Sequence, residues 1–590
     1  MTGSPDQRSY GVAPEAAPPD HASLLLELST GQVDPAQAVA LAEQQCRISG
    51  QPLWNLPLGL ALWQLKDYER AWHALSQASG VAANDPNYYT LLGMVGRRLP
   101  ARLSEAIRAY RNAIRLEPER HDVYYNLANL LSADQVGPAE RAFRLSLRFN
   151  AEAAATWHNL GRLLSDRDQP ELALNALRTS LRLDPLEADV WCNLGLAWYH
   201  LEEFDRALAC LYHSISLDKT HAASFINIGN ALISKLEPEQ ALTYLQRGVE
   251  LDSSSSNSLW NLALAYLLLG DYKRGWEYYE GRFRTEQFDL IAIPTTGPAP
   301  ATLADCPGPG DPPLVVWCEQ GIGDAIQFCR YLPMLEARGI PFEVYCRPSL
   351  VSLLRDWQRL GDRVKPYHNR TDPDDDRPQV ALLSLPRLFG TELHTVPSVL
   401  PYLLPPEPPP DRLRVQPPPG GIAVGFVWAT NPDNKAMYRH KTMPMEVLLP
   451  RLLQLVDLDL IDLHSLQVGD DAAGFATHTQ AGRIIDWNGR LETFADTAHV
   501  LQQLDLVIAV DTAVAHLAAA LDRPTWLLLP YNADFRWLRQ RSDSPWYPSM
   551  RLFRQASRGD WLSVRDQVHA ALDQLFLLDI GALSADRQLP

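Results

Sequence analysis

A single polar residue recurs at a fixed phase in the first half of the chain. Between its positions, apolar and small residues fall on two helical stripes separated by a turn. The recurring residues are asparagines at steps of 33, 34, 34 and 34 residues, each followed by an apolar residue and then by Gly or Ala: Asn126, Asn159, Asn193, Asn227 and Asn261. A self-similarity of about 34 residues predicts helical hairpins stacked into a solenoid with a long concave surface.

The segment 191–220 is a typical repeat of this pattern. Its small residues Gly195 and Ala207 allow the two helices to approach closely, and larger side chains fill the gap to the next repeat. Weaker copies extend the array to about seven repeats over residues 51–290. We expect residues 21–50 to form an atypical helical start that caps the array.

The hydrophobic period changes after the last repeat. A proline-rich connector over residues 291–313 precedes short apolar runs that alternate with helical patterns, which predicts parallel α/β layering. A second proline-rich segment, residues 405–420, separates an N-terminal lobe over residues 314–404 from a C-terminal lobe over residues 421–580. The apolar runs are Leu314–Cys318, Phe342–Cys346, Val380–Leu385, Ile422–Trp428, Leu458–Leu463, Leu506–Val510 and Thr525–Leu529.

Charge and composition narrow the class of protein. The formal net charge of -17 argues against a nucleic-acid partner, which would need a basic surface. Residues 1–20 lack the apolar core of a secretory signal and are expected to be disordered, and residues 581–590 form a tail. The most apolar stretch, Leu259–Gly270, is shorter than the roughly 20 residues that span a bilayer. The sequence therefore predicts a cytoplasmic protein without a membrane span.

The seven cysteines show no CxxC spacing, and several stand in apolar runs. Zinc sites and redox pairs usually show such a spacing. The pattern therefore favours buried free thiols over disulfides or zinc ligands.

Several strings in the chain carry a family resemblance. The 34-residue repeats resemble the tetratricopeptide repeat, and the strings after them are similar to a C-terminal glycosyltransferase family 9 domain, the lipopolysaccharide-heptosyltransferase group. In chain order these strings read WEYYEGRF, WCEQGIGDAIQFCRYLPML, GFVWATNP with KTMP, FADTA, DLVIAVDTAVAHLAAAL, and SPWYPSMRLFRQ with GDW, within about residues 270 to 575. The resemblance implies an α-solenoid followed by an α/β GT-B glycosyltransferase domain of two Rossmann-like lobes. It also implies a nucleotide sugar held mainly by the C-terminal lobe, and no metal or other cofactor.

The turn Gly321–Asp324 follows the first strand of the N-terminal lobe and opens a helix. Its glycines permit a tight turn that points Asp324 toward the cleft between the lobes. From the residues alone, Asp324 is either a helix N-cap or a general base. The resemblance implies the second role, because the family places its candidate catalytic base at this aspartate.

A second strand-to-helix turn stands in the C-terminal lobe. Unpaired backbone N–H groups at the start of this helix form an anion site that suits a diphosphate. Asp511 either orients the donor sugar or caps the helix, and His516 either contacts phosphate or belongs to the core. The predicted donor-binding residues are Thr430, Asn431, Asp511, Thr512, Ala513, Val514 and His516.

Lys441, just ahead of Thr442, matches the lysine that the family uses to neutralise the leaving group. Lys435 and Arg439 are nearby rivals for this role. The resemblance therefore implies a catalytic pair, Asp324 and Lys441.

The acceptor is assigned partly to the repeats. Side-chain amides in line on the inner helices can donate to and accept from an extended peptide backbone. The alternative is that these amides bond between neighbouring helices. The predicted acceptor-binding residues are Asn126, Asn159, Asn193, Asn227, Asn261, Gln320 and Gln327.

One acidic stretch imitates the metal-binding DxD of another glycosyltransferase class. It comprises Asp372, Asp374, Asp375 and Asp376, but no apolar strand leads into it and prolines flank it. We therefore expect a solvated loop there and no metal site.

Together these features predict an inverting, metal-independent transferase. It would move a sugar from a nucleotide-diphosphate sugar to a hydroxyl of a protein or surface-glycan acceptor, held partly in the repeat groove. The alternative is a tetratricopeptide-repeat scaffold for protein interactions whose transferase-like domain is inactive. Transfer to a lipopolysaccharide core is disfavoured because a repeat solenoid has no evident role with a lipid-linked sugar.

Overall fold

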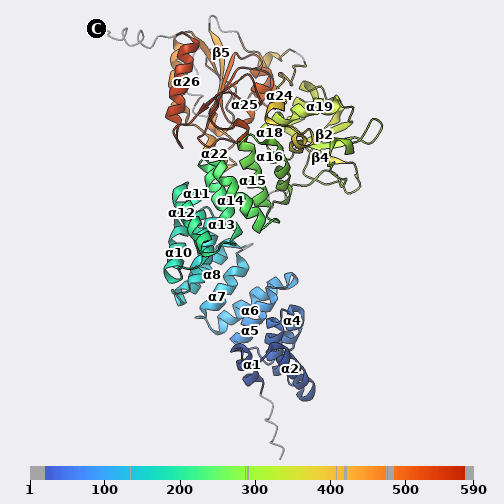
Figure 1. Ribbon diagram of the computed structural model, residues 1–590, viewed down its shortest axis with the longest axis vertical. Helices are drawn as coiled ribbons and strands as arrows, with labels where there is room; N and C mark the ends of the chain where they lie inside the picture. Colours follow the sequence, from blue (N-terminus) through green and yellow to red (C-terminus); the bar gives the residue numbers. More distant parts are fainter. Residues whose placement is uncertain are drawn as a thin grey trace, which may run out of the picture. The chain divides into compact units, whose positions relative to one another are not determined.

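The computed structural model describes residues 20–132, 135–285, 288, 291–406, 408–416, 421–472, 475 and 484–577 (Figure 1). The predicted disordered start, apart from Asp20, and the predicted tail lie outside these described residues. By its internal contacts the chain divides into two compact units, Met1–Lys219 (unit 1) and Thr220–Pro590 (unit 2).

Unit 1 is built from helices that pack in consecutive pairs. Aspartates cap the starts of several of them; Asp34, for example, accepts a hydrogen bond from the Gln37 N–H, and Pro35 occupies the first turn. Helices α1 (His21–Ser29) and α2 (Pro35–Ser49) come first. The hairpins that follow are α3 (Asn55–Gln64) with α4 (Tyr68–Gln77), α5 (Pro86–Gly96) with α6 (Leu103–Leu116), α7 (His121–Leu131) with α8 (Val136–Phe149), α9 (Ala154–Asp166) with α10 (Pro170–Leu183), and α11 (Ala188–His200) with α12 (Phe204–Leu217).

The same two contacts close several hairpins, which explains the period of the sequence. A Cβ on Gly195 in α11 would lie 2.7 Å from the Cγ of Leu211 in α12, so only glycine admits this leucine. A serine near the end of the second helix donates its hydroxyl to the first carbonyl of the partner helix: Ser146 to His121 (2.8 Å), Ser180 to Ala154 (2.9 Å) and Ser214 to Ala188 (2.8 Å). The predicted helical repeats are confirmed.

Unit 2 begins with two further hairpins and a 3-10 turn. They are α13 (Ala222–Ser234) with α14 (Pro238–Leu251) and α15 (Ser256–Leu268) with α16 (Tyr272–Tyr279), followed by η3 (Glu280–Arg284).

Two parallel sheets follow in unit 2, as predicted. The first has the order β3-β2-β1-β4 and the second the order β10-β9-β8-β5-β6-β7. Every pairing between neighbouring strands is parallel. The strands are β1 (Leu314–Trp317), β2 (Phe342–Cys346), β3 (Val364–Pro366), β4 (Gln379–Ala381), β5 (Ile422–Val427), β6 (Ile461–Ser465), β7 (Ile484–Asp486), β8 (Leu506–Val510), β9 (Thr525–Leu529) and β10 (Met550–Arg554).

Helices cover both faces of the second sheet (Figure 1). Val507 and Ala509 of β8 belong to the apolar cluster that contains α24 (Phe494–Leu501) and α25 (Ala513–Ala520). Ile508 and Val510 point to the other cluster, with α23 (Leu449–Asp457) and α26 (Trp561–Leu575). The first sheet is accompanied by α18 (Ile322–Phe328), α19 (Leu332–Glu336), α20 (Pro348–Ser352) and α21 (Leu385–Leu388), and α22 (Lys435–Lys441) follows β5.

Three details differ from the apolar runs in the sequence. The run Leu458–Leu463 begins three residues before its strand β6, because Asp459 takes a left-handed conformation (φ 60°) that ends α23. The run Val380–Leu385 is a strand only to Ala381 and then a 3-10 turn. The outer strands β3, β7 and β10 were not predicted; β3 and β7 have only three residues each.

In the described part of the chain, no helix combines the length and the apolar character needed to cross a bilayer. Its cysteines are all free thiols, and Cys192, Cys210, Cys318, Cys329 and Cys346 are buried. The prediction of buried free thiols holds for these five cysteines, whereas Cys46 and Cys306 are partly exposed.

The contact at Gly195 predicts that an added methyl group destabilises the hairpin. Gly195→Ala should lower the free energy of unfolding by about 1 kcal/mol, because overpacking costs about 1–3 kcal/mol and helix propensity returns at most about 1 kcal/mol. Gly137→Ala in α8 is the control for overpacking, since Arg141 Nη1, at 3.9 Å, is the nearest atom to its Cβ apart from the chain neighbours and the backbone of its own helix. Urea unfolding followed by circular dichroism should show the larger loss of stability for Gly195→Ala, and equal losses would contradict this account of the hairpin.

Candidate active site

Two helix starts from different sheets meet in unit 2. Helix α18 follows β1 and helix α25 follows β8. A Cβ on Gly323 in α18 would lie 3.0 Å from Cδ2 of His516 and 3.5 Å from Cα of Ala513, both in α25. The absence of a side chain at Gly323 thus allows the two turns to come into contact.

Asp324 lies in the first turn of α18 and faces this junction. One carboxylate oxygen accepts a hydrogen bond from the Gly321 N–H (3.0 Å), and the other forms an ion pair with Arg536. Burial raises the pKa of the Asp324 carboxyl above its usual range, although the Arg536 guanidinium opposes the shift. The residue therefore caps the turn and is also a partly buried carboxylate with the raised proton affinity of a base.

Arg536 is the main residue that the sequence did not reveal. Its side chain is only 7% exposed and bonds to three groups: Asp324, Asp534 Oδ1 at 2.7 Å and Gln327 Oε1 at 2.8 Å. Burial lowers the pKa of this guanidinium, but Asp534 and Asp324 outweigh burial and raise it. Arg536 is thus a permanent cation beside the candidate base.

Lys441 and Asp511 form the second ion pair of the site, in which Asp511 is buried and Lys441 is partly buried. Lys441 Nζ lies 2.6 Å from Asp511 Oδ2. Met443 donates its N–H to the Trp428 carbonyl (2.9 Å), which holds the KTMP segment against the end of β5, next to β8. Burial alone would raise the pKa of Asp511, but the Lys441 ammonium is the main opposing influence, and the pKa is lowered to about 2.

His516 is buried between both lobes and is neutral. Burial lowers its pKa to about 3. Its Nδ1 lies 3.0 Å from the Tyr547 hydroxyl, and its Nε2 lies 3.8 Å from Asp511 Oδ1. A neutral ring with one nitrogen on Tyr547 turns the other nitrogen toward the Asp511 side of the site.

The start of α25 offers groups that suit an anion. Thr512 is the N-cap residue, yet its hydroxyl makes no cap hydrogen bond; it is buried and has no partner among the described residues. Ala513 and Val514 occupy the first turn, so their N–H groups lack intrahelical acceptors. Both residues are also partly exposed. A ligand oxygen would satisfy these donors.

The other predicted donor residues lie at the end of β5. The Thr430 N–H donates to Thr442 Oγ1 (3.2 Å), and the Asn431 side chain accepts from the Asp433 N–H (3.1 Å) and is exposed. The rivals of Lys441, Lys435 and Arg439, are exposed.

The two glutamines assigned to the acceptor have different surroundings. Gln320 is partly exposed and donates its amide to the Tyr279 hydroxyl (3.0 Å). Gln327 is fully buried and its oxygen accepts from Arg536. The structure thus places Gln327 behind Arg536 rather than on an open surface.

Several of the recurring asparagines bond to the preceding repeat. Asn159 Nδ2 donates to Tyr125 Oη (3.1 Å) and to Asn129 Oδ1 (2.9 Å). Asn193 Nδ2 lies 2.7 Å from His158 Nε2, and Asn126 Oδ1 accepts from Arg97 at 3.4 Å. These contacts favour the alternative of bonds between neighbouring helices, and all five asparagines, Asn227 and Asn261 included, stay partly exposed. Peptide binding by this row remains a prediction.

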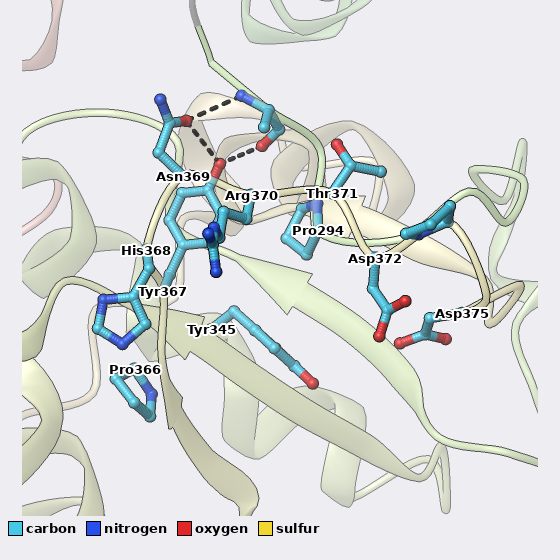
Figure 2. A pocket seen from close by; sticks show the side chains of 12 residues that line it. Pro294, Tyr345, Pro366, Tyr367, His368, Asn369, Arg370, Thr371, Asp372 and Asp375 are labelled. Atoms are coloured by element: carbon cyan, nitrogen blue, oxygen red, sulfur yellow. Dashed lines mark hydrogen bonds between the residues drawn. The ribbon is translucent and has the colours of Figure 1, made fainter.

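The acidic stretch lines a surface hollow of about 520 Å³ near the ends of β2 and β3. Figure 2 shows Asp372 and Asp375 on one side of this hollow, Tyr367 and His368 on the other side, and Tyr345 between them. Asp375 pairs with Arg377 (2.7 Å). Among the described residues, no three His, Cys, Asp or Glu side chains are grouped so as to hold a metal ion.

Comparisons with known proteins agree with both halves of this description. Residues 158–212 and 226–281 match the family model of the tetratricopeptide repeat, and residues 483–529 match that of glycosyltransferase family 9 (heptosyltransferase). The second match covers β8, the turn with Asp511 to His516, and β9.

A curated relative is the protein FlbA of Caulobacter vibrioides, 25% identical over 344 residues. The match covers 52% of this chain, and the chain spans about half (54%) of the length of FlbA.

Solved repeat proteins match only part of the chain. YrrB, a tetratricopeptide-repeat protein, is 23% identical and covers 32% of this chain and 96% of its own, with a TM-score of 0.28. PilF of Pseudomonas aeruginosa is 20% identical and covers 35% and 96%, with a TM-score of 0.30. Scores this low carry no argument about function. The chain is therefore similar to tetratricopeptide-repeat proteins over residues 158–212 and 226–281, and to glycosyltransferase family 9 over residues 483–529.

Proposed function

We propose that the chain is an inverting glycosyltransferase of the GT-B type that acts in the cytoplasm. It would move a sugar from a nucleotide-diphosphate sugar to a hydroxyl of a protein or surface-glycan acceptor. The observation that carries the proposal is the junction of α18 and α25. The partly buried Asp324 carboxylate, the buried Arg536 guanidinium, the partly buried Lys441 ammonium and the free first turn of a helix come together there.

Asp324 is the proposed base. Its carboxylate would take the proton of the acceptor hydroxyl while that oxygen attacks the anomeric carbon on the face opposite the diphosphate. One C–O bond forms as the bond to the phosphate oxygen breaks, which inverts the anomeric configuration. The raised pKa of Asp324 supports this role because a carboxylate that binds protons more tightly is a stronger base.

The leaving diphosphate needs compensation for its developing negative charge. Lys441 Nζ, the N–H groups at the start of α25 and the unpartnered Thr512 hydroxyl supply donors there. The proposal therefore assigns this charge to protein groups and requires no metal ion. In the unliganded site Lys441 is held by Asp511, so the ligand would share the ammonium with that carboxylate.

The acceptor is proposed to reach Asp324 along Gln320 and the repeats. Gln320 is partly exposed and contacts Tyr279 of α16, so the last repeat lies beside the turn that carries the base. Asn261 in α15 is partly exposed as well. A protein or glycan hydroxyl is favoured over a lipid-linked one because a repeat array suits an extended polymer.

Nucleotide binding tests the donor site. In thermal unfolding with ADP, UDP, GDP and their sugars, one nucleotide should stabilise the protein by about 2.7 kcal/mol at 100 times its dissociation constant. Lys441→Ala should weaken this ligand by about 1.5–3 kcal/mol, the value of a charged hydrogen bond. Lys435→Ala, at the exposed rival, is the control and should bind normally. Absence of stabilisation by every nucleotide would favour the scaffold alternative.

Turnover tests the base. Asp324→Asn keeps the acceptor for the Gly321 N–H but removes the charge, so it should lower turnover by about 10²–10⁴-fold and leave nucleotide binding unchanged. Asp372→Asn, in the exposed acidic stretch, is the matched control. Release of nucleoside diphosphate from the donor identified by unfolding gives the rate. Wild-type turnover in Asp324→Asn would remove this residue from the mechanism.

A further inference from the structure

The last repeat is packed into the core of the two sheets. Trp276 of α16 contacts Phe328 of α18 (ring centroids 5.7 Å apart) and Phe535, next to Arg536 (5.8 Å). The Trp546 indole donates to the Tyr272 hydroxyl (3.1 Å). Residues of α16 thus share one apolar cluster with both sides of the candidate active site.

Arg282, in the turn η3 after α16, makes the most buried ionic contact of this interface. Its side chain and that of Glu319 are both 0% exposed, and Arg282 Nη2 lies 3.0 Å from Glu319 Oε1. Arg282 also bonds to Glu280 Oε1 (2.8 Å) and to Ser384 Oγ (2.8 Å). Glu319 accepts in addition from the Leu383 N–H (3.3 Å) behind β4.

The partners of the last repeat stand directly before the turn that carries Asp324. Glu319 is held by Arg282, and the next residue, Gln320, donates to the Tyr279 hydroxyl. The residue after that, Gly321, donates its N–H to Asp324. An unbroken series of contacts therefore connects the repeat to the candidate base.

Because Arg282 and Glu319 are buried, their ion pair tolerates little change in distance or orientation. A guanidinium and a carboxylate taken out of water need each other at hydrogen-bond distance, and removal of either leaves an uncompensated charge. Arg282 reaches Glu280 through Nη1 and Glu319 and Ser384 through Nη2, so two nitrogens of a rigid fork make these contacts. The three donors of a lysine ammonium radiate from one nitrogen and do not reproduce this geometry.

We propose that Arg282 is a positioning residue: the last repeat fixes the segment Glu319–Gln320 and thereby the turn Gly321–Asp324. Residues 272–284 then belong to the catalytic half of the protein as well as to the repeat array. The effect on catalysis rests on the proposed function of Asp324, whereas the fixing of the turn does not.

The test uses the full chain with Arg282→Lys and a matched control, Arg539→Lys. Arg539 also attaches the repeats to the second lobe, through Glu239 and the Leu236 carbonyl, but far along the chain from the turn and with an exposed partner. Both variants keep a positive charge and lose a guanidinium fork.

The first readout is alkylation by iodoacetamide, measured by mass spectrometry at each cysteine. Cys318 is buried beside Glu319, and Cys192 and Cys210 are buried in unit 1. Arg282→Lys should label Cys318 about tenfold faster through local opening, with Cys192 and Cys210 unchanged. Arg539→Lys should label all three as the wild type does.

The second readout is donor turnover. Arg282→Lys should lower kcat by about 10²-fold, as expected for a misplaced catalytic group, while the nucleoside diphosphate binds within about twofold of the wild type. If Arg282 had a purely structural role, Arg282→Lys would lower the amount of folded protein. The kcat of the remaining folded protein would then equal that of the wild type.

The outcomes separate the two proposals. Protected Cys318 together with wild-type kcat in Arg282→Lys overturns the positioning role. Faster labelling of Cys318 in a protein whose wild type turns over no nucleotide sugar supports the fixing of the turn and defeats the proposed function. If Arg282→Lys also exposes Cys192 and Cys210, the variant Tyr279→Phe decides between the outcomes, because it removes only the hydroxyl that holds Gln320. Faster labelling of Cys318 in Tyr279→Phe supports the proposal. Labelling at the wild-type rate overturns it.

Discussion

The burial of opposite charges at the junction of α18 and α25 is the constraint on which the rest of the structure depends. Asp324 with Arg536, and Asp511 with Lys441, are ion pairs whose side chains are at most 24% exposed. Charges removed from water persist only with partners at fixed geometry. The strand ends, the KTMP segment and the loop with Arg536 must therefore hold their places together, and a diphosphate that enters must exchange partners with carboxylates already present.

A similar burial of charge joins the last repeats to the half of the chain that carries the two sheets. The periodicity of the sequence changes near residue 290, but the boundary between the compact units falls within the repeats, after Lys219. The reason is visible in the packing: Tyr272, Trp276 and Tyr279 lie in the apolar cluster of both sheets, and Arg282 is buried against Glu319. A repeat that serves as a core element can transmit its position to the site.

Local patterns predicted what depends on local contacts. The helical period of the sequence arises from contacts inside one hairpin, such as that of Gly195 with Leu211. The turns with Asp324 and Asp511 follow apolar strands that can be recognised from their own residues. Arg536 escaped prediction because its partner Asp324 stands 212 residues away and nothing in its neighbours marks a buried guanidinium. Gln327 shows the reverse case, since it was predicted to bind the acceptor but its side chain is fully buried. Strands β3 and β7 span too few residues to show an apolar pattern.

The central claim is that a nucleoside diphosphate binds where the two helix starts meet. A crystal structure of the protein with the nucleotide that stabilises it most is the most direct test. The account predicts the diphosphate at the first turn of α25, within hydrogen-bond distance of Lys441 Nζ and the Thr512 hydroxyl. A nucleotide bound elsewhere, with the Lys441–Asp511 and Arg536–Asp324 pairs unchanged, would contradict it.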